Sequence, residues 1–102
     1  MKGEILGGRL LVLHPTDTVG TAIEAIDEGE RISMAGETLV IAESIPFGHK
    51  VALATIESGG PVRKYGEVIG QAMTAIEPGD WVHTHNLESR RGRGDRTAEA
   101  DA

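Results

Sequence analysis

Short apolar runs separated by turn residues occupy most of the first 87 positions of the chain. Five runs, at residues 9–13, 38–42, 50–54, 62–65 and 81–86, are rich in strand-forming residues and have turn residues nearby, so they predict strands. Residues 31–42 are predicted to form a hairpin about Gly36. Val and Ile number 16 against 7 Leu, and β-branched side chains suit pleated strands. The pattern predicts a mainly β fold.

One segment has helical spacing instead. Val19, Ala22, Ile23 and Ile26 recur at intervals of three and four, which is typical of the apolar face of a helix. Asp17 or Thr18 could cap its start and Gly29 could end it. Residues 17–29 are therefore predicted to contain one short helix.

An eleven-residue phrase occurs three times: AIEAIDEGERI from Ala22, ALATIESGGPV from Ala52 and AMTAIEPGDWV from Ala72. Each copy has an Ile followed three positions later by a Gly, which can adopt the positive φ of a tight turn. The copies are 30 and 20 residues apart, and this unequal spacing is not that of a solenoid. The repeats predict one compact, folded-over β unit.

Composition narrows the classes of function. A chain of 102 residues has room for one domain, and a net charge of −6 argues against general nucleic-acid binding. There is no cysteine, so disulfides and thiolate metal sites are not expected. There is no secretory signal near Met1 and no apolar run long enough to span a membrane, so a cytoplasmic protein is expected. Residues 88–102 are mostly charged or small and are predicted to be a disordered tail after a folded domain at 1–87.

The residues that could carry chemistry are histidines and lysines. On a strand at 81–86, His83 and His85 would project from one face, where they could ligate a metal or protonate an oxyanion. The alternative is that they lie on the solvated face of an edge strand.

Lys50 and Lys64 each stand in an apolar run and could bind a substrate carboxylate or, if desolvated, act as a base. The alternative is that they face water and protect a sheet edge. Tyr65 and Trp81 are expected to be core or interface anchors rather than platforms on which bases stack.

The phrases HPTDTVGTAI and IPFGHKVALATIESGGPVRKYGEVIGQAMTAIEPGDWVHTHN resemble the N-terminal SAF domain of the altronate and galactarate dehydratase family. The resemblance covers residues 11–87 and departs from the family at Thr18, where members commonly carry Asn. It implies a small β-clip-like fold. In that family the domain is either fused ahead of a large catalytic domain or exists as a separate small subunit, and the small subunit of sulfolactate sulfo-lyase is similar.

The resemblance also implies a function and a set of site residues. The chain would be the small subunit of a sugar-acid or related hydroxy-acid dehydratase, inactive alone, completing the active site of a large catalytic chain. A divalent metal such as iron would be held mainly by the large chain, and a homo-oligomer is compatible with this arrangement. The alternatives are a freestanding module that binds sugar acids or carbohydrate, and a purely structural subunit. The implied catalytic residues are His49, His83 and His85, with His83 and His85 alternatively as metal ligands, and the implied substrate-binding residues are His14, Asp17, Lys50, Lys64, Tyr65 and Asn86.

Overall fold

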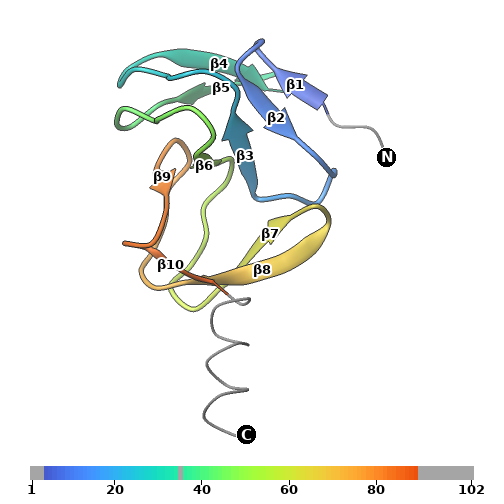
Figure 1. Cartoon of the computed structure of the whole chain (residues 1–102), viewed down its shortest axis with the longest axis vertical. Helices are drawn as coiled ribbons and strands as arrows, with labels where there is room; N and C mark the ends of the chain where they lie inside the picture. Colours follow the sequence, from blue (N-terminus) through green and yellow to red (C-terminus); the bar gives the residue numbers. More distant parts are fainter. Residues whose placement is uncertain (1–3, 35, 90–102) are drawn as a thin grey trace, which may run out of the picture.

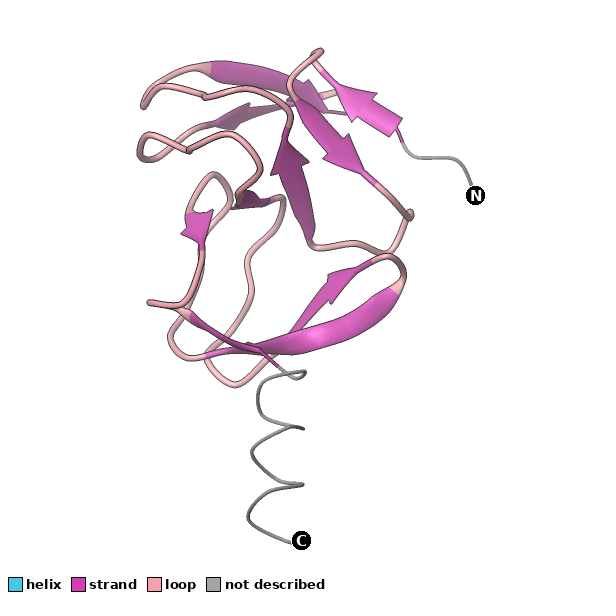
Figure 2. Cartoon of the chain, viewed as in Figure 1, coloured by secondary structure: helices cyan, strands magenta, loops and turns pink. Residues whose placement is uncertain are grey.

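The computed structural model describes residues 4–34 and 36–89, and this part of the chain consists of strands and turns without a helix (Figures 1 and 2). Accordingly, it contains no helix that could cross a membrane. The strands are β1 (Glu4–Leu6), β2 (Leu10–Val12), β3 (Val19–Ala22), β4 (Arg31–Met34), β5 (Glu37–Val40), β6 (Lys50–Ala52), β7 (Pro61–Lys64), β8 (Glu67–Ala72), β9 (Trp81–Val82) and β10 (Leu87–Ser89). The mainly β prediction is confirmed.

The strands form three antiparallel sheets, which Figure 1 shows folded over one another. A five-stranded sheet has the order β1-β2-β3-β6-β9, a three-stranded sheet has the order β10-β8-β7, and β4 pairs with β5 in the predicted hairpin. Two apolar clusters make up the core. The first contains Leu10, Ala22, Ile26, Ile32, Leu39, Ile41, Ile45 and Val51, and the second contains Val19, Ala52, Ile56, Val62, Ala72, Ile76 and Val82.

Four turns of one design connect the strands. Each begins at a buried Ile, and the isoleucines bridge in pairs, Ile26 with Ile45 and Ile56 with Ile76. Three residues after each Ile stands a Gly whose φ lies between 83° and 92°. The sequence phrase predicted three of these turns. The fourth turn, at Ile45, was not predicted because its sequence does not match the phrase. The preceding alanine lies three residues before the Ile rather than four.

The predicted short helix at 17–29 is wrong. Residues 19–22 form β3, which lies between β2 and β6, and Ile26 begins the first of the four turns. The apolar residues that suggested one helix face point in different directions: Val19 packs in the second core cluster, Ala22 in the first, and Ile23 is 37 % exposed. Pairing with two neighbouring strands satisfies the backbone of this segment, and such pairing is not visible in local spacing.

Other boundaries also differ from the prediction. The predicted strand at 81–86 ends at Val82, and β1, β3, β8 and β10 were not predicted. The last of these places Glu88 and Ser89 in a strand paired with β8, although both belonged to the predicted tail. Residues 90–102 lie outside the described residues, so the prediction that they are disordered stays a prediction.

Truncation after Ser89 is expected to lower the melting temperature by less than about 4 °C, because no apolar pattern after that residue predicts packing. Truncation after Asn86 is the matched control. It should lower the melting temperature by about 8 °C or more, since it removes β10 and the half-buried Leu87, which packs against the second core cluster. Equal melting temperatures for the two truncated chains would contradict the expectation.

Candidate functional site

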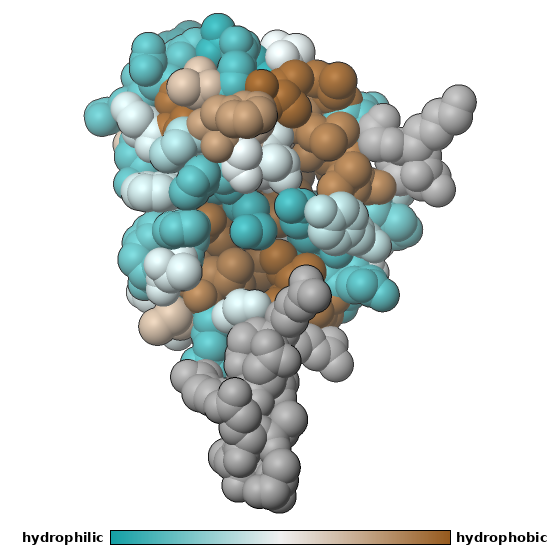
Figure 3. All heavy atoms as spheres, in the orientation of Figure 1, coloured by the Kyte–Doolittle hydropathy of each residue, from teal (hydrophilic) through white to brown (hydrophobic). Residues whose placement is uncertain are grey.

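A pocket of about 690 Å³ opens where the five-stranded and three-stranded sheets meet. Charged and imidazole side chains reach it from β6, β7, the start of β8 and the turn after β9, and Val68, Ile69 and Leu87 supply an apolar wall. Figure 3 shows hydrophilic residues across the middle of this face, between two apolar areas. The lining residues are Lys50, Lys64, Tyr65, Glu67, Val68, Ile69, His83, Thr84, Leu87 and Ser89.

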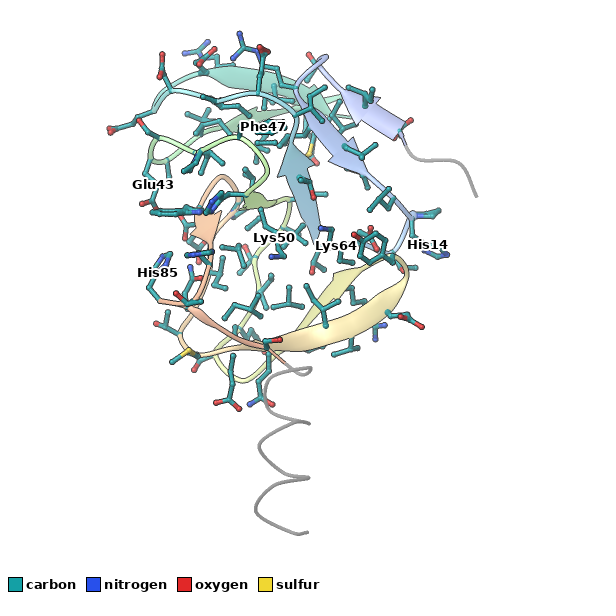
Figure 4. All side chains as sticks on the ribbon, in the orientation of Figure 1. His14, Glu43, Phe47, Lys50, Lys64 and His85 are labelled. Atoms are coloured by element: carbon teal, nitrogen blue, oxygen red, sulfur yellow. The ribbon has the colours of Figure 1, made fainter. Side chains whose placement is uncertain are left out.

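Two lysines give the pocket its positive charge. Lys50 begins β6 and Lys64 ends β7, and Figure 4 shows both in the space between these strands. Burial lowers the pKa of Lys50, and the positive charge of Lys64 lowers it further. Two half-buried ammonium groups that repel one another favour an anion between them. Both lysines are half-buried and line the pocket, and Lys64 ends β7 at the edge of its sheet, so the roles predicted for them stay predictions.

Tyr65 stands at the tip of the β7–β8 turn. Its φ of 61° is the only positive value at a non-glycine residue among those described. The ring is 59 % exposed, and Lys64 Nζ lies 4.9 Å from the ring centroid. This cation–π contact orients the ammonium group of Lys64 at the rim of the pocket. Tyr65 is thus a surface residue of the site and not a core anchor.

Three imidazoles gather around Trp81 beside the pocket. The Trp81 Nε1–H donates to His49 Nδ1 at 3.1 Å, so the neutral His49 ring carries its proton on Nε2. The His83 ring stacks on the indole with a centroid distance of 5.4 Å and an interplanar angle of 10°. His85 meets the same indole at 5.4 Å and 53°, and the rings of His49 and His83 are 4.7 Å apart.

The prediction that His83 and His85 share one face of a strand is wrong, because both lie in the turn that follows β9. Asn86 stabilises this turn: its Oδ1 accepts from the His83 N–H at 2.9 Å, and its Nδ2 donates to the Trp81 carbonyl at 2.8 Å. The turn nevertheless keeps both rings on Trp81. It directs His83, and not His85, into the pocket lining.

The pKa of His83 is lower than that of a free imidazole. Burial is the main cause, and Coulombic interactions with His49, Lys50 and His85 lower the pKa further. A neutral imidazole can accept a proton, and it can also ligate a metal. His83 is therefore the histidine of this pocket that is best suited to accept a proton.

A complete metal site does not fit the described residues. They contain no group of three or more His, Cys, Asp or Glu side chains placed to hold a metal ion. Nδ1 of His49 is already the acceptor of the Trp81 indole N–H. At most, His83 and His85 could add ligands to a metal held elsewhere, so their assignment as metal ligands stays a prediction.

Three of the predicted substrate-binding residues lie away from the pocket lining. Asp17 and Asn86 are buried, with exposed fractions of 8 % and 5 %, and their side chains bond to backbone groups. His14 bonds to Thr16 and lies against Gly66, beyond Lys64 as seen from Lys50 (Figure 4). The pocket brings together Lys50, Lys64, Tyr65 and His83, with His49 and His85 alongside.

Trp81 is the residue of this site that the sequence interpretation undervalued. It was expected to be a core or interface anchor, whereas its half-buried ring contacts three histidines. The sequence signal that could have assigned Trp81 to the site is its position two residues before His83. Thr84 and Glu67 also line the pocket and carried no sequence signal.

A small antiparallel β domain with a cationic, histidine-flanked pocket is the class of protein that these observations define. The chain belongs to the altronate/galactarate dehydratase SAF domain family, whose model matches residues 8–90. It is similar to altronate dehydratase of Escherichia coli, at 38 % identity over 77 residues, which are 76 % of this chain and 16 % of that protein. The chain thus spans about a sixth of the length of this relative.

Two other relatives are much shorter. Over 88 residues the chain is 35 % identical to the (2R)-sulfolactate sulfo-lyase subunit alpha of Chromohalobacter salexigens, covering 78 % of this chain and 94 % of that subunit. With the same subunit of Paracoccus pantotrophus it shares 45 % identity over 53 residues, covering 52 % of this chain and 79 % of the subunit. The same domain therefore aligns with part of a long chain and with most of a short subunit.

Proposed function

We propose that this chain is the small subunit of a lyase that dehydrates a sugar acid or a related hydroxy acid. Its pocket would form one side of an active site, and a separate large chain would complete it. The alignment over 94 % of a relative named as a subunit supports a separate small chain. The names of the long relatives, altronate and galactarate dehydratase, support the class of reaction.

The observation that carries the proposal is the meeting of Lys50, Lys64 and His83 at one pocket. Removing a proton next to a carboxylate builds negative charge, which cationic side chains stabilise. We assign this role to the two ammonium groups, which would also hold the substrate carboxylate.

Expelling the β-hydroxyl group needs a proton donor, and removing the α-proton needs an acceptor. We assign both proton functions to His83, which lines the pocket: its ring accepts the α-proton, and the imidazolium so formed donates that proton to the leaving hydroxyl group. The His49 ring lies beside it, at a centroid distance of 4.7 Å. The divalent metal and its place in the large chain remain part of the proposal and do not enter these steps.

A second function is that of a freestanding module, in which the two lysines of the pocket would bind the carboxylate of a sugar acid. The domain could then bind a sugar acid without any catalysis. The two functions differ in what the large chain contributes, and one experiment separates them.

The full-length chain, purified alone, is expected not to dehydrate altronate or galactarate and not to eliminate sulfite from (2R)-sulfolactate. Mixed with a dehydratase-like large chain from the same genome, the chain should restore turnover of one of these compounds, as measured by the release of keto acid or sulfite. Turnover by the chain alone would contradict the subunit proposal. Binding of these acids without any effect on the activity of the large chain would establish the binding module instead.

A further inference from the structure

A buried carboxylate holds the turn that carries Lys64 and Tyr65. Oδ1 of Asp17 accepts from the Gly66 N–H at 2.8 Å, and Oδ2 accepts from the Tyr65 N–H at 3.1 Å and the Leu13 N–H at 3.3 Å. Asp17 is 8 % exposed. Among residues 4–34 and 36–89 the ion pairs are those of Arg9, so backbone N–H groups, and not a cation, compensate the Asp17 charge.

One of the hydrogen bonds that Asp17 accepts comes from Tyr65, whose backbone conformation is strained. A left-handed φ such as the 61° of Tyr65 is uncommon outside glycine and persists only where the surroundings enforce it. Asp17 bonds the amide of Tyr65 and the amide that follows it. The carboxylate therefore stabilises the backbone conformation that sets the direction of the Tyr65 ring.

Other residues of the segment that contains Asp17 also contact this turn. Thr18 Oγ1 accepts from the Arg63 N–H at 3.0 Å, and the Thr18 N–H donates to the Arg63 carbonyl at 3.1 Å. On another side of the turn the His14 ring lies so close that a Cβ at Gly66 would be 2.9 Å from it. The segment from His14 to Thr18 thus contacts the turn at Arg63, Tyr65 and Gly66.

We propose that Asp17 is a positioning residue, which acts through Lys64 and Tyr65 and does not touch the substrate. Both of its oxygens are occupied by backbone donors, and a carboxylate would repel the anionic substrate of the proposed function. Asp17 is absent from the lining of the pocket, whereas Lys64 and Tyr65 belong to it. That the pocket binds a hydroxy acid rests on the proposed function. The effect of Asp17 on the conformation of the turn is independent of that function.

The test of the turn geometry uses NMR of the free, full-length Asp17→Asn chain. An Asn amide group would place its N–H donors against backbone N–H donors, so the turn should rearrange. The ring-current shift of the Lys64 ε-methylene protons, which reports the contact with the Tyr65 ring, should fall to half or less of its wild-type value. Asp27→Asn, an equal change of charge at an exposed residue outside the pocket, should leave this shift unchanged. A folded Asp17→Asn chain with the wild-type shift would overturn the proposal.

A second measurement separates positioning from direct contact, with galactarate as the probe and the two-chain complex as the protein. Asp17→Asn and Lys64→Met should each weaken binding by about 10-fold, and the double variant should bind no more weakly than Lys64→Met alone. Additive losses would show that Asp17 acts independently of Lys64 and would overturn the proposal. If the wild-type complex does not bind galactarate, the choice of ligand in the proposed function fails, and the NMR result still decides the role of Asp17.

A third comparison covers the case in which Asp17→Asn does not fold. Tyr65→Gly removes the side chain that makes a left-handed φ costly, so the turn should then depend less on the carboxylate. The Tyr65→Gly chain that also carries Asp17→Asn should therefore fold and show a cooperative thermal transition where Asp17→Asn alone does not. A double variant that is unfolded while Tyr65→Gly alone is folded would overturn the proposal.

Discussion

Gly79→Ala is expected to destabilise the domain by about 4 kcal/mol or more, which is most of the stability of a small domain. Gly79 has φ +92°, and an added Cβ would overlap the carbonyl oxygen of Val40 and lie 3.1 Å from its carbonyl carbon. Neither group can easily move, because the N–H of Ala42, two residues after Val40, donates to the Gly79 carbonyl at 3.0 Å. Urea unfolding of the purified chain, followed by the fluorescence of its one tryptophan, measures the loss.

Gly29→Ala is the matched control for this prediction. Gly29 occupies the same place in another of the four turns and has φ +86°, but an added Cβ would meet nothing within 4 Å. Only the cost of a left-handed alanine remains, about 1–2 kcal/mol. The difference between the two variants is the cost of the clash with Val40. Equal destabilisation would mean that the β4–β5 hairpin moves away from this turn at little cost.

His83→Gln is expected to lower kcat of the two-chain enzyme by about 100-fold, the usual size of a lost general acid or base. His83 lines the pocket, and burial, together with Coulombic interactions with His49 and Lys50, lowers its pKa. His85→Gln should have a smaller effect, because His85 is exposed and reaches the site only through the Trp81 ring. Steady-state kinetics with the sugar acid or hydroxy acid that the complex turns over measures both variants.

The melting temperatures of the two histidine variants provide the control. Each should unfold within about 0.5 kcal/mol of the wild type, since neither side chain belongs to the core. A raised KM with unchanged kcat in His83→Gln would assign His83 to binding rather than to proton transfer. Wild-type kcat and KM in both variants would leave the histidines without a part in the reaction.

Much of the fold could be predicted because its signals are local. Glycine at a fixed distance after a buried Ile encodes a turn within a few residues, and the β-branched runs encode strands. The predicted helix failed for the opposite reason. Strand β3 owes its conformation to hydrogen bonds with β2 and β6, and the β6 residues it pairs with lie about 30 positions later in the chain.

The histidines and lysines of the site could be named from the sequence, but their arrangement could not. Strand alternation misplaced His83 and His85, because Asn86 ends the strand with two hydrogen bonds that spacing does not reveal. Trp81 belongs to the site because its indole N–H donates to His49, which lies 32 residues away in the sequence. Contacts of this kind depend on how the sheets fold over one another.

The sequence by itself determined the β class, the positions of three of the four glycine turns and the residue types available for chemistry, because turn and strand preferences act over a few neighbouring residues. The tertiary structure alone decided which side chains share the pocket and which support it. Asp17 looks like a helix cap from its neighbours, yet its carboxylate bonds to amides 48 and 49 residues away. A buried charge takes whatever donors the fold brings to it, and only the packing of β7 and β8 against the loop before β3 brings these.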